Sequence, residues 1–205
     1  MKLELTSDPS TWKQAFLDLK HKNVEDLARL LEVDRKTLLH YAYARKQTDY
    51  KEFYLKKKSG GRRKIETPVT NLKILQSKLS KILYQVFDSK PSVHGFCVQK
   101  SIVTNSQRHT NKRLVLNLDL EDFFPSINFG RVRGLFLAKP YEFESYIATL
   151  IANICCYKNG LPQGAPTSPI MSNLICFRLD SQLYALAKKK GVVYSRYADD
   201  ITFST

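Results

Sequence analysis

Apolar residues follow a helical period over the N-terminal part of the chain, residues 10–46. The repeat is carried by Val24, Leu27, Leu30 and Leu31, and then by Leu38, Leu39 and Ala42. Asn23 precedes the first apolar run and is the expected N-cap, with Asp26 in the first helical turn. We therefore expect two helices separated by a short turn at Val33 and Asp34.

This helix pair has two interpretations. The pattern is similar to a helix-turn-helix, in which the second helix reads the major groove of DNA. It also fits two helices that pack together in an N-terminal extension. The pattern is common and its turn contains no glycine, so packed helices are favoured.

The rest of the chain mixes helical and strand patterns. Amphipathic helices are predicted over residues 71–88, 128–138, 142–155 and 169–190. The apolar run 113–120 is typical of a strand, and residues 192–205, "VVYSRYADDITFST", predict two strands around a tight turn. This combination predicts an α+β fold.

A basic hairpin is predicted over residues 51–67, with Gly60 and Gly61 at its turn. The stretch from Lys51 to Lys64 contains seven basic residues and one acid, Glu52. Such a tip binds phosphates through its charge and its exposed N–H groups. Taken alone, the segment fits a solvated turn slightly better.

The composition is that of a globular protein with polyanionic partners. Of 205 residues, 33 are Lys or Arg and 19 are Asp or Glu, which gives a net charge of +14 and points to nucleic acid before general solubility. No run of about 18 uncharged apolar residues and no secretory signal are evident, so no membrane association is expected. The four cysteines lack a CxxC pairing, so we expect neither a zinc site nor a disulfide framework. Free cysteines fit a reducing compartment, and we therefore expect a cytoplasmic location.

Three aspartates lie where packing does not explain them. Asp119 ends an apolar strand, and Asp199 and Asp200 are adjacent at the turn between two apolar strands. Clustered carboxylates need cations, and Mg²⁺ prefers such hard oxygen ligands. Two Mg²⁺ ions would serve a phosphoryl transfer there. For an isolated Asp-Asp pair an ordinary turn would be favoured, whereas the full tetrapeptide with its strand flanks is more specific.

Three motifs in order resemble those of reverse transcriptases. "YADD" (197–200) resembles their catalytic hairpin, "LNLDLEDFFPSI" (116–127) their first palm motif, and "LPQGAPTSPIMSN" (161–173) their LPQG motif. The wider match is most similar to bacterial retron reverse transcriptases. "GFCVQKSIVTNSQRH" (95–109) resembles a retron segment that contains an Asn-Ala-x-x-His element, here with a serine in place of the alanine.

The resemblance implies roles for individual residues. Asp119, Asp199 and Asp200 match the catalytic metal ligands, and the backbone carbonyl of Leu120 completes the shell of one ion. Phe124 matches the steric gate that selects deoxynucleotides, while Phe123 is expected in the core. The residues matched to nucleotide binding are Arg63, helped by Lys58 or Lys64, together with Gln163 and Gly164.

Three further residues are matched to RNA. Asn105 and His109 belong to the retron-type element and are expected to bind RNA. Arg196 has two equally weighted interpretations, a contact with nucleic acid or an ordinary surface charge.

The resemblance also implies a domain plan. Residues 1–48 would form an N-terminal helical extension, 49–112 the fingers, and 113–205 the palm, with a fingers insertion around 128–170. In the family the rest of the palm and a helical thumb follow. The expected fold is therefore right-hand polymerase fingers and an incomplete palm, with the thumb absent.

The implied function is a retron-type RNA-directed DNA polymerase with two Mg²⁺ ions. Its implied partners are dNTPs, a structured non-coding RNA template and primer, the cDNA/RNA hybrid, and an accessory effector protein in anti-phage defence. Two alternatives remain open. One is a non-catalytic nucleic-acid-binding fragment, and the other is a polymerase similar to group II intron maturases.

Overall fold

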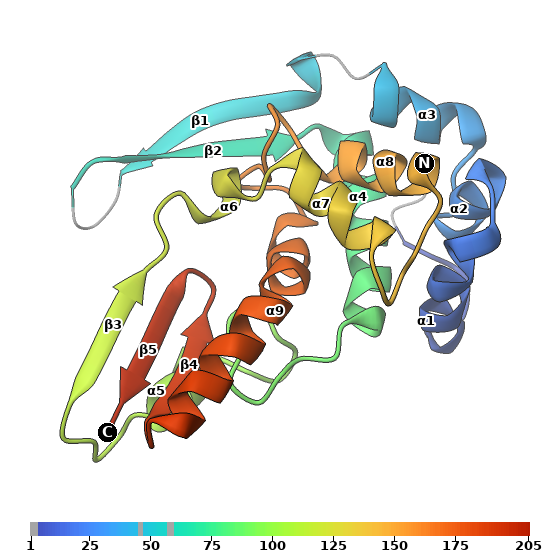
Figure 1. Cartoon of the computed structure of the whole chain (residues 1–205). Helices are drawn as coiled ribbons and strands as arrows, with labels where there is room; N and C mark the ends of the chain where they lie inside the picture. The colour runs from blue at the N-terminus through green and yellow to red at the C-terminus, as the bar shows by residue number, and fades with distance from the viewer. Residues whose placement is uncertain (1–3, 45–46, 57–59) are drawn as a thin grey trace. The chain divides into compact units, whose positions relative to one another are not determined.

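The computed structural model describes residues 4–44, 47–56 and 60–205, which form two compact units (Figure 1). The first unit comprises Met1–Phe87 and Phe124–Met171, and the second comprises Asp88–Phe123 and Ser172–Thr205. The expected boundaries of the extension, fingers and palm are subdomain boundaries of a protein family, and a division into compact units does not test them. They stay a prediction.

Residues 9–43 are largely helical, as the apolar period predicted, and the turn at Val33 and Asp34 separates two helices as expected. The elements are α1 (Pro9–Leu17), the short 3₁₀ helix η1 (Asp18–His21), α2 (Val24–Leu30) and α3 (Arg35–Tyr43). Asn23 and Asp26 form a capping box at the start of α2, which confirms Asn23 as the N-cap. Leu27, Leu31 and Leu38 are fully buried, so the α2–α3 pair packs into the core, and the choice between its two interpretations stays a prediction.

A basic hairpin follows a short turn, η2 (Gln47–Asp49). Strands β1 (Tyr50–Lys56) and β2 (Arg62–Pro68) pair antiparallel and form a two-stranded sheet, as predicted (Figure 1). Gly60 and Gly61 have φ of 90° and 78°, a left-handed backbone that suits glycine before β2.

The remaining helices of the first unit are α4 (Thr70–Val86), α7 (Phe129–Leu137) and α8 (Ser145–Cys155). All three lie within a few residues of the predicted ranges. Phe16 of α1 packs edge-on against Phe136 and Phe143, with ring centroids 6.0 and 5.2 Å apart. Tyr141 adds a fourth ring, and this cluster joins the N-terminal helices to α7. The short α6 (Phe123–Ser126) and the long α9 (Ser168–Lys189) each run from one unit into the other.

The second unit contains a three-stranded antiparallel sheet, in the order β3-β5-β4. Its elements are α5 (Ile102–Gln107), β3 (Val115–Asp119), β4 (Val193–Tyr197) and β5 (Asp200–Ser204). One face of the sheet packs on the C-terminal part of α9, where Ala187 meets Tyr194 and Ile201. Both predicted strands around the tight turn are confirmed.

Strand β3 is more exposed than its apolar sequence suggests. Val115, Leu116 and Leu118 keep about half of their surface exposed. All five residues of β3 are exposed, whereas β4, at the opposite edge of the same sheet, is mostly buried, so the edge position alone does not explain this exposure. In the described ranges no helix is both long and apolar enough to cross a membrane.

Candidate active site

The sheet of the second unit brings two distant acids face to face. Asp119 is the last residue of β3 and Asp200 is the first residue of β5, and the two are direct partners in the antiparallel register. Directly opposed residues of antiparallel strands point to the same face, with Cβ atoms about 4.5–5.5 Å apart. The Leu120 N–H extends the pairing, because it donates to the carbonyl of Asp199 at 3.1 Å.

A two-residue loop holds the third acid. Tyr197 ends β4 and pairs with Asp200, so Ala198 and Asp199 alone make the turn. Ala198 has a φ of +58°, in the left-handed region that residues with a side chain rarely adopt. All three predicted acids therefore belong to one end of one sheet.

The electrostatics of this cluster favour a cation. Partial burial, together with the charges of Asp199 and Asp119, raises the pKa of Asp200. Carboxylate oxygens and the nearby carbonyl of Leu120 are hard donors of the kind that Mg²⁺ prefers. These donor groups fit a divalent cation because all of them are oxygen atoms and their residues lie together at one end of the sheet.

The side chains of Asp119, Asp199 and Asp200 do not converge on one point as the ligands of a bound metal ion would. In the part of the chain that the structure describes, no three His, Cys, Asp or Glu side chains converge closely enough to hold a metal ion.

Arg196 corrects a prediction. Both interpretations placed its side chain at the surface, against RNA or solvent, but it is fully buried. Its guanidinium binds both oxygens of Asp180 on α9, at 2.7 and 2.8 Å. Arg196 alternates with Ser195 and Tyr197 along β4, so it points to the helix-covered face of the sheet and away from the acids. It is therefore not available for RNA.

Asp180 is a residue that the sequence reasoning missed. It is buried in α9 and accepts hydrogen bonds from Arg196 and from the Tyr194 hydroxyl, the latter at 2.7 Å. The available signal was an aspartate among the apolar positions of the predicted helix 169–190.

Asn105 and His109 lie at the other face of the same sheet. Asn105 is buried in α5, and the His109 ring lies between two hydroxyl groups, those of Ser195 and Ser204, each 2.7 Å from a ring nitrogen. Burial, together with the charge of Arg108, lowers the pKa of His109. The lowered pKa favours the neutral ring, which joins its segment to the sheet, while an RNA contact by either residue stays a prediction.

Two predicted nucleotide-binding segments meet in the first unit. The Glu66 N–H of β2 donates to the carbonyl of Gln163 at 3.0 Å, so the LPQG loop runs along this strand. Gly164 has a φ of +141°, and a Cβ there would lie 2.9 Å from the carbonyl oxygen of Glu66. Glycine permits this close approach. Arg63 is exposed three residues earlier on the same strand.

The two predicted helpers of Arg63 differ. Lys64 forms ion pairs with Glu52 at 3.0 Å and Glu66 at 2.8 Å, and these hydrogen bonds raise its pKa. Lys64 is therefore engaged within the hairpin. Lys58 lies outside the described residues.

The two adjacent phenylalanines also differ. Phe123 is buried and Phe124 is half-buried. This agrees with one ring in the core and the other closer to solvent. The gating role of Phe124 stays a prediction.

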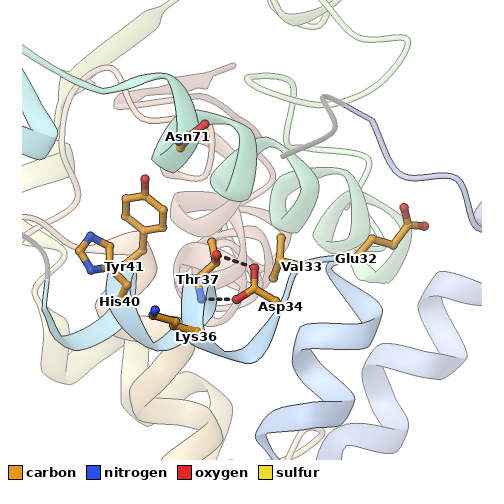
Figure 2. Close-up of a pocket in the computed structure, with 8 residues that line it drawn as sticks. All are labelled: Glu32, Val33, Asp34, Lys36, Thr37, His40, Tyr41 and Asn71. Atoms are coloured by element: carbon orange, nitrogen blue, oxygen red, sulfur yellow. Dashed lines mark hydrogen bonds between the residues drawn. The ribbon is translucent and has the colours of Figure 1, made fainter.

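A cavity of about 580 Å³ lies elsewhere in the first unit, at the α2–α3 turn (Figure 2). Its two acids already have partners: Asp34 accepts from Thr37, and Glu32 accepts from the backbone of Thr6 and Ser7. Its lining includes no residue of the predicted site. These carboxylates stabilise the helix pair.

Comparisons with known proteins agree with the motifs. A family model described as "Reverse transcriptase (RNA-dependent DNA polymerase)" matches residues 55–205. The chain is 37% identical over 186 residues to the retron Ec86 reverse transcriptase of Escherichia coli, covering 89% of this chain and 57% of that protein. It is 38% identical over 201 residues to the retron Mx65 reverse transcriptase of Myxococcus xanthus, covering 88% and 47%. The chain thus spans about half the length of these relatives.

Proposed function

This chain belongs to the reverse transcriptase (RNA-dependent DNA polymerase) family, and from that premise we propose that it carries the catalytic centre of an RNA-directed DNA polymerase of retron type. The observation that carries the proposal is the direct pairing of Asp119 with Asp200, beside Asp199. A protein that only binds polyanions gains nothing from three acids at one end of a sheet.

In this proposal the sheet β3-β5-β4 belongs to the palm, and the β1–β2 hairpin belongs to the fingers. The reaction is attack of a primer hydroxyl on the α-phosphate of a dNTP, with pyrophosphate leaving. Asp119, Asp199 and Asp200 would hold two Mg²⁺ ions, with the carbonyl of Leu120 as a further ligand. Bound there, Mg²⁺ supplies charge stabilisation for the attacking and leaving oxygens.

Residues of the first unit would bind and select the nucleotide. The Arg63 guanidinium suits triphosphate oxygens, since its planar fork donates two parallel hydrogen bonds. Gln163 and Gly164 would let the LPQG loop approach the substrate closely. Phe124 would crowd a ribose 2′-hydroxyl, and such a contact discriminates by about 1–3 kcal/mol.

The template in this proposal is a structured non-coding RNA, and the product is a cDNA/RNA hybrid. The similarity to relatives named as retron reverse transcriptases supports this choice. The net charge of +14 favours such polyanionic partners. A role in anti-phage defence with an effector protein belongs to the same proposal.

One observation favours a second candidate, a binding module without catalysis. The β1–β2 hairpin exposes Tyr54 on the face that it shares with Arg62 and Lys64, and aromatic rings among basic residues bind single strands by stacking and charge. This surface serves a polymerase equally well, so it does not displace the first proposal.

Primer extension on polyriboadenylate with an oligodeoxythymidylate primer, dTTP and Mg²⁺ separates the two candidates. Asp200→Asn and Asp199→Asn should each abolish incorporation while RNA binding persists. Glu144→Gln is the control, because it neutralises an exposed acid that makes no capping hydrogen bond. Incorporation that survives in both aspartate variants would refute the catalytic assignment.

A further inference from the structure

We propose that Asp180 and Arg196 are positioning residues for the catalytic turn. Asp180 orients the Arg196 guanidinium, which in turn holds the carbonyl of Ala198, the residue directly before Asp199 and Asp200. This inference rests on the proposed function, because it explains how the acids of that site are kept in place.

Arg196 is bound through all three nitrogens of its guanidinium. Nε and Nη2 donate to the two oxygens of Asp180 at 2.7 and 2.8 Å, which is a bidentate pair. Nη2 also donates to Oδ1 of Asn173 at 3.0 Å. Nη1 donates to the carbonyl oxygen of Ala198 at 2.8 Å. Asp180 therefore holds one edge of the Arg196 guanidinium, and the opposite edge holds the carbonyl oxygen of Ala198 in the turn.

The backbone of Arg196 is fixed as well. Its N–H donates to the carbonyl of Ser92 at 2.9 Å, and its own carbonyl accepts from the N–H of His94 at 2.8 Å. The neighbouring chain segment thus braces β4 on the side away from β5. The guanidinium thus reaches Ala198 from a residue whose backbone is hydrogen-bonded to residues outside the turn.

A second contact holds Ala198 from another direction. A Cβ on Gly95 would lie 2.2 Å from the backbone nitrogen of Ala198, so the two backbones are in close contact. Asn173 joins both sides, since its Nδ2 donates to the Gly95 carbonyl at 3.0 Å while its Oδ1 accepts from Arg196. The unusual left-handed φ of Ala198 is therefore over-determined, as strained residues at functional sites require.

Stability alone is a weak reason for such a pair. Both side chains are buried, with 0% and 1% of their surface exposed, and buried ion pairs are often replaceable by apolar residues without loss of stability. What an apolar pair cannot supply is a donor to the Ala198 carbonyl. The pair therefore serves the geometry of the turn.

The test removes this hydrogen bond without leaving a buried charge. Tyr194→Phe is the matched control, because it deletes one partner of Asp180 and leaves every bond of Arg196 intact. Asp180→Leu with Arg196→Met in the Tyr194→Phe background then removes both charges together. Each protein, in its natural full length, is assayed with polyriboadenylate, oligodeoxythymidylate, dTTP and Mg²⁺, and its thermal unfolding is measured.

We expect the triple variant to unfold near the control temperature, with kcat reduced about 100-fold and the KM for dTTP changed less than threefold, because misplacement by about 1 Å costs that much. A folded triple variant with kcat within twofold of the control would overturn the inference. If wild type itself incorporates no nucleotide, the proposed function fails instead.

Arg196→Lys covers the case in which the triple variant does not fold. Lysine keeps the charge next to Asp180 but cannot reach Asp180, Asn173 and Ala198 together. We expect a folded protein with kcat reduced about tenfold and a higher half-saturating Mg²⁺ concentration. Wild-type kcat and Mg²⁺ dependence in this variant would contradict the positioning role.

Discussion

The two sheets of the molecule use charge in opposite ways. The β1–β2 hairpin places Arg62 and Arg63 at the surface, and its ion pairs around Lys64 are at least partly exposed. In the sheet β3-β5-β4, the acids share one face, while Arg196 is buried with Asp180 against the other. Binding a polyanion needs only exposed charge. A reaction centre also needs buried residues that hold its charged groups in defined positions. The predictions below test this difference.

The largest effect is expected from Asp119→Asn, on the strand that faces the turn. In the proposed function Asp119 is a metal ligand, and its loss removes several kcal/mol of charge stabilisation, so incorporation should fall at least ~10³-fold. Stability should not fall, because the substitution also removes repulsion between carboxylates. Steady-state primer extension and thermal unfolding measure the two quantities. A loss of activity that merely parallels a loss of folded protein would contradict this.

Gly95→Ala should damage the turn through its backbone. The added Cβ meets the nitrogen of Ala198 at 2.2 Å, a contact that neither backbone can avoid without moving. We expect a loss near the upper end of about 1–3 kcal/mol in the free energy of unfolding, with a lower kcat. Urea unfolding measures the first quantity. Gly134→Ala is the control, because a Cβ there meets nothing within 4 Å.

A pH effect of similar size is expected from His94, which is buried in the second unit. Burial, followed by the charges of Lys100, Arg108 and His109, lowers its pKa to about 4. The unfolded chain therefore takes up this proton more readily, near pH 6.5. The contribution to stability is complete above about pH 6.5 and is lost as the pH falls toward 4, by up to about 3 kcal/mol.

Urea unfolding of wild type and of His94→Gln at several pH values between 4 and 7 measures this contribution. Wild type should lose stability with falling pH more steeply than the variant. The remaining slope belongs to other groups, including His109, whose pKa burial also lowers. Equal slopes in the two proteins would show that His94 does not titrate as described.

On the hairpin, Arg63→Ala should act on substrate binding alone. A hydrogen bond to a charged group contributes about 1.5–3 kcal/mol, so the KM for the dNTP should rise about 10- to 100-fold with little change in kcat. Arg62→Ala is the control, since this neighbour is equally exposed but alternates to the other face of β2. Similar effects of both variants would show that only overall charge matters.

The smallest effect is expected from Lys64→Ala. Its ion pairs with Glu52 and Glu66 are partly exposed, and such pairs contribute below about 1 kcal/mol. Thermal unfolding at low and high salt should differ little from wild type. A loss above about 2 kcal/mol would mean that charge fixes the hairpin as firmly as it fixes the catalytic turn.

Much of this molecule could be predicted from local patterns. The helical period located α4, α7, α8 and α9, Asn23 was identified as an N-cap, and the tight turn of "YADD" followed from two apolar strands around two acids. Motif order indicated the family, which the comparisons confirmed. These features depend on residues close together in the chain, so a short window of sequence contains their physical cause.

The tertiary structure decided what depends on partners far apart in the chain. Arg196 was expected at the surface, against RNA or solvent, and its partner Asp180 comes from a different element, 16 residues earlier in the chain. The apolar sequence of β3 does not reveal that the strand is exposed, and the need for glycine at position 95 follows from Ala198 lying against it. The sequence by itself determined which chemical groups the site contains. The pairing of strands and the burial of one ion pair determined where those groups lie, because register and desolvation are properties of the folded chain.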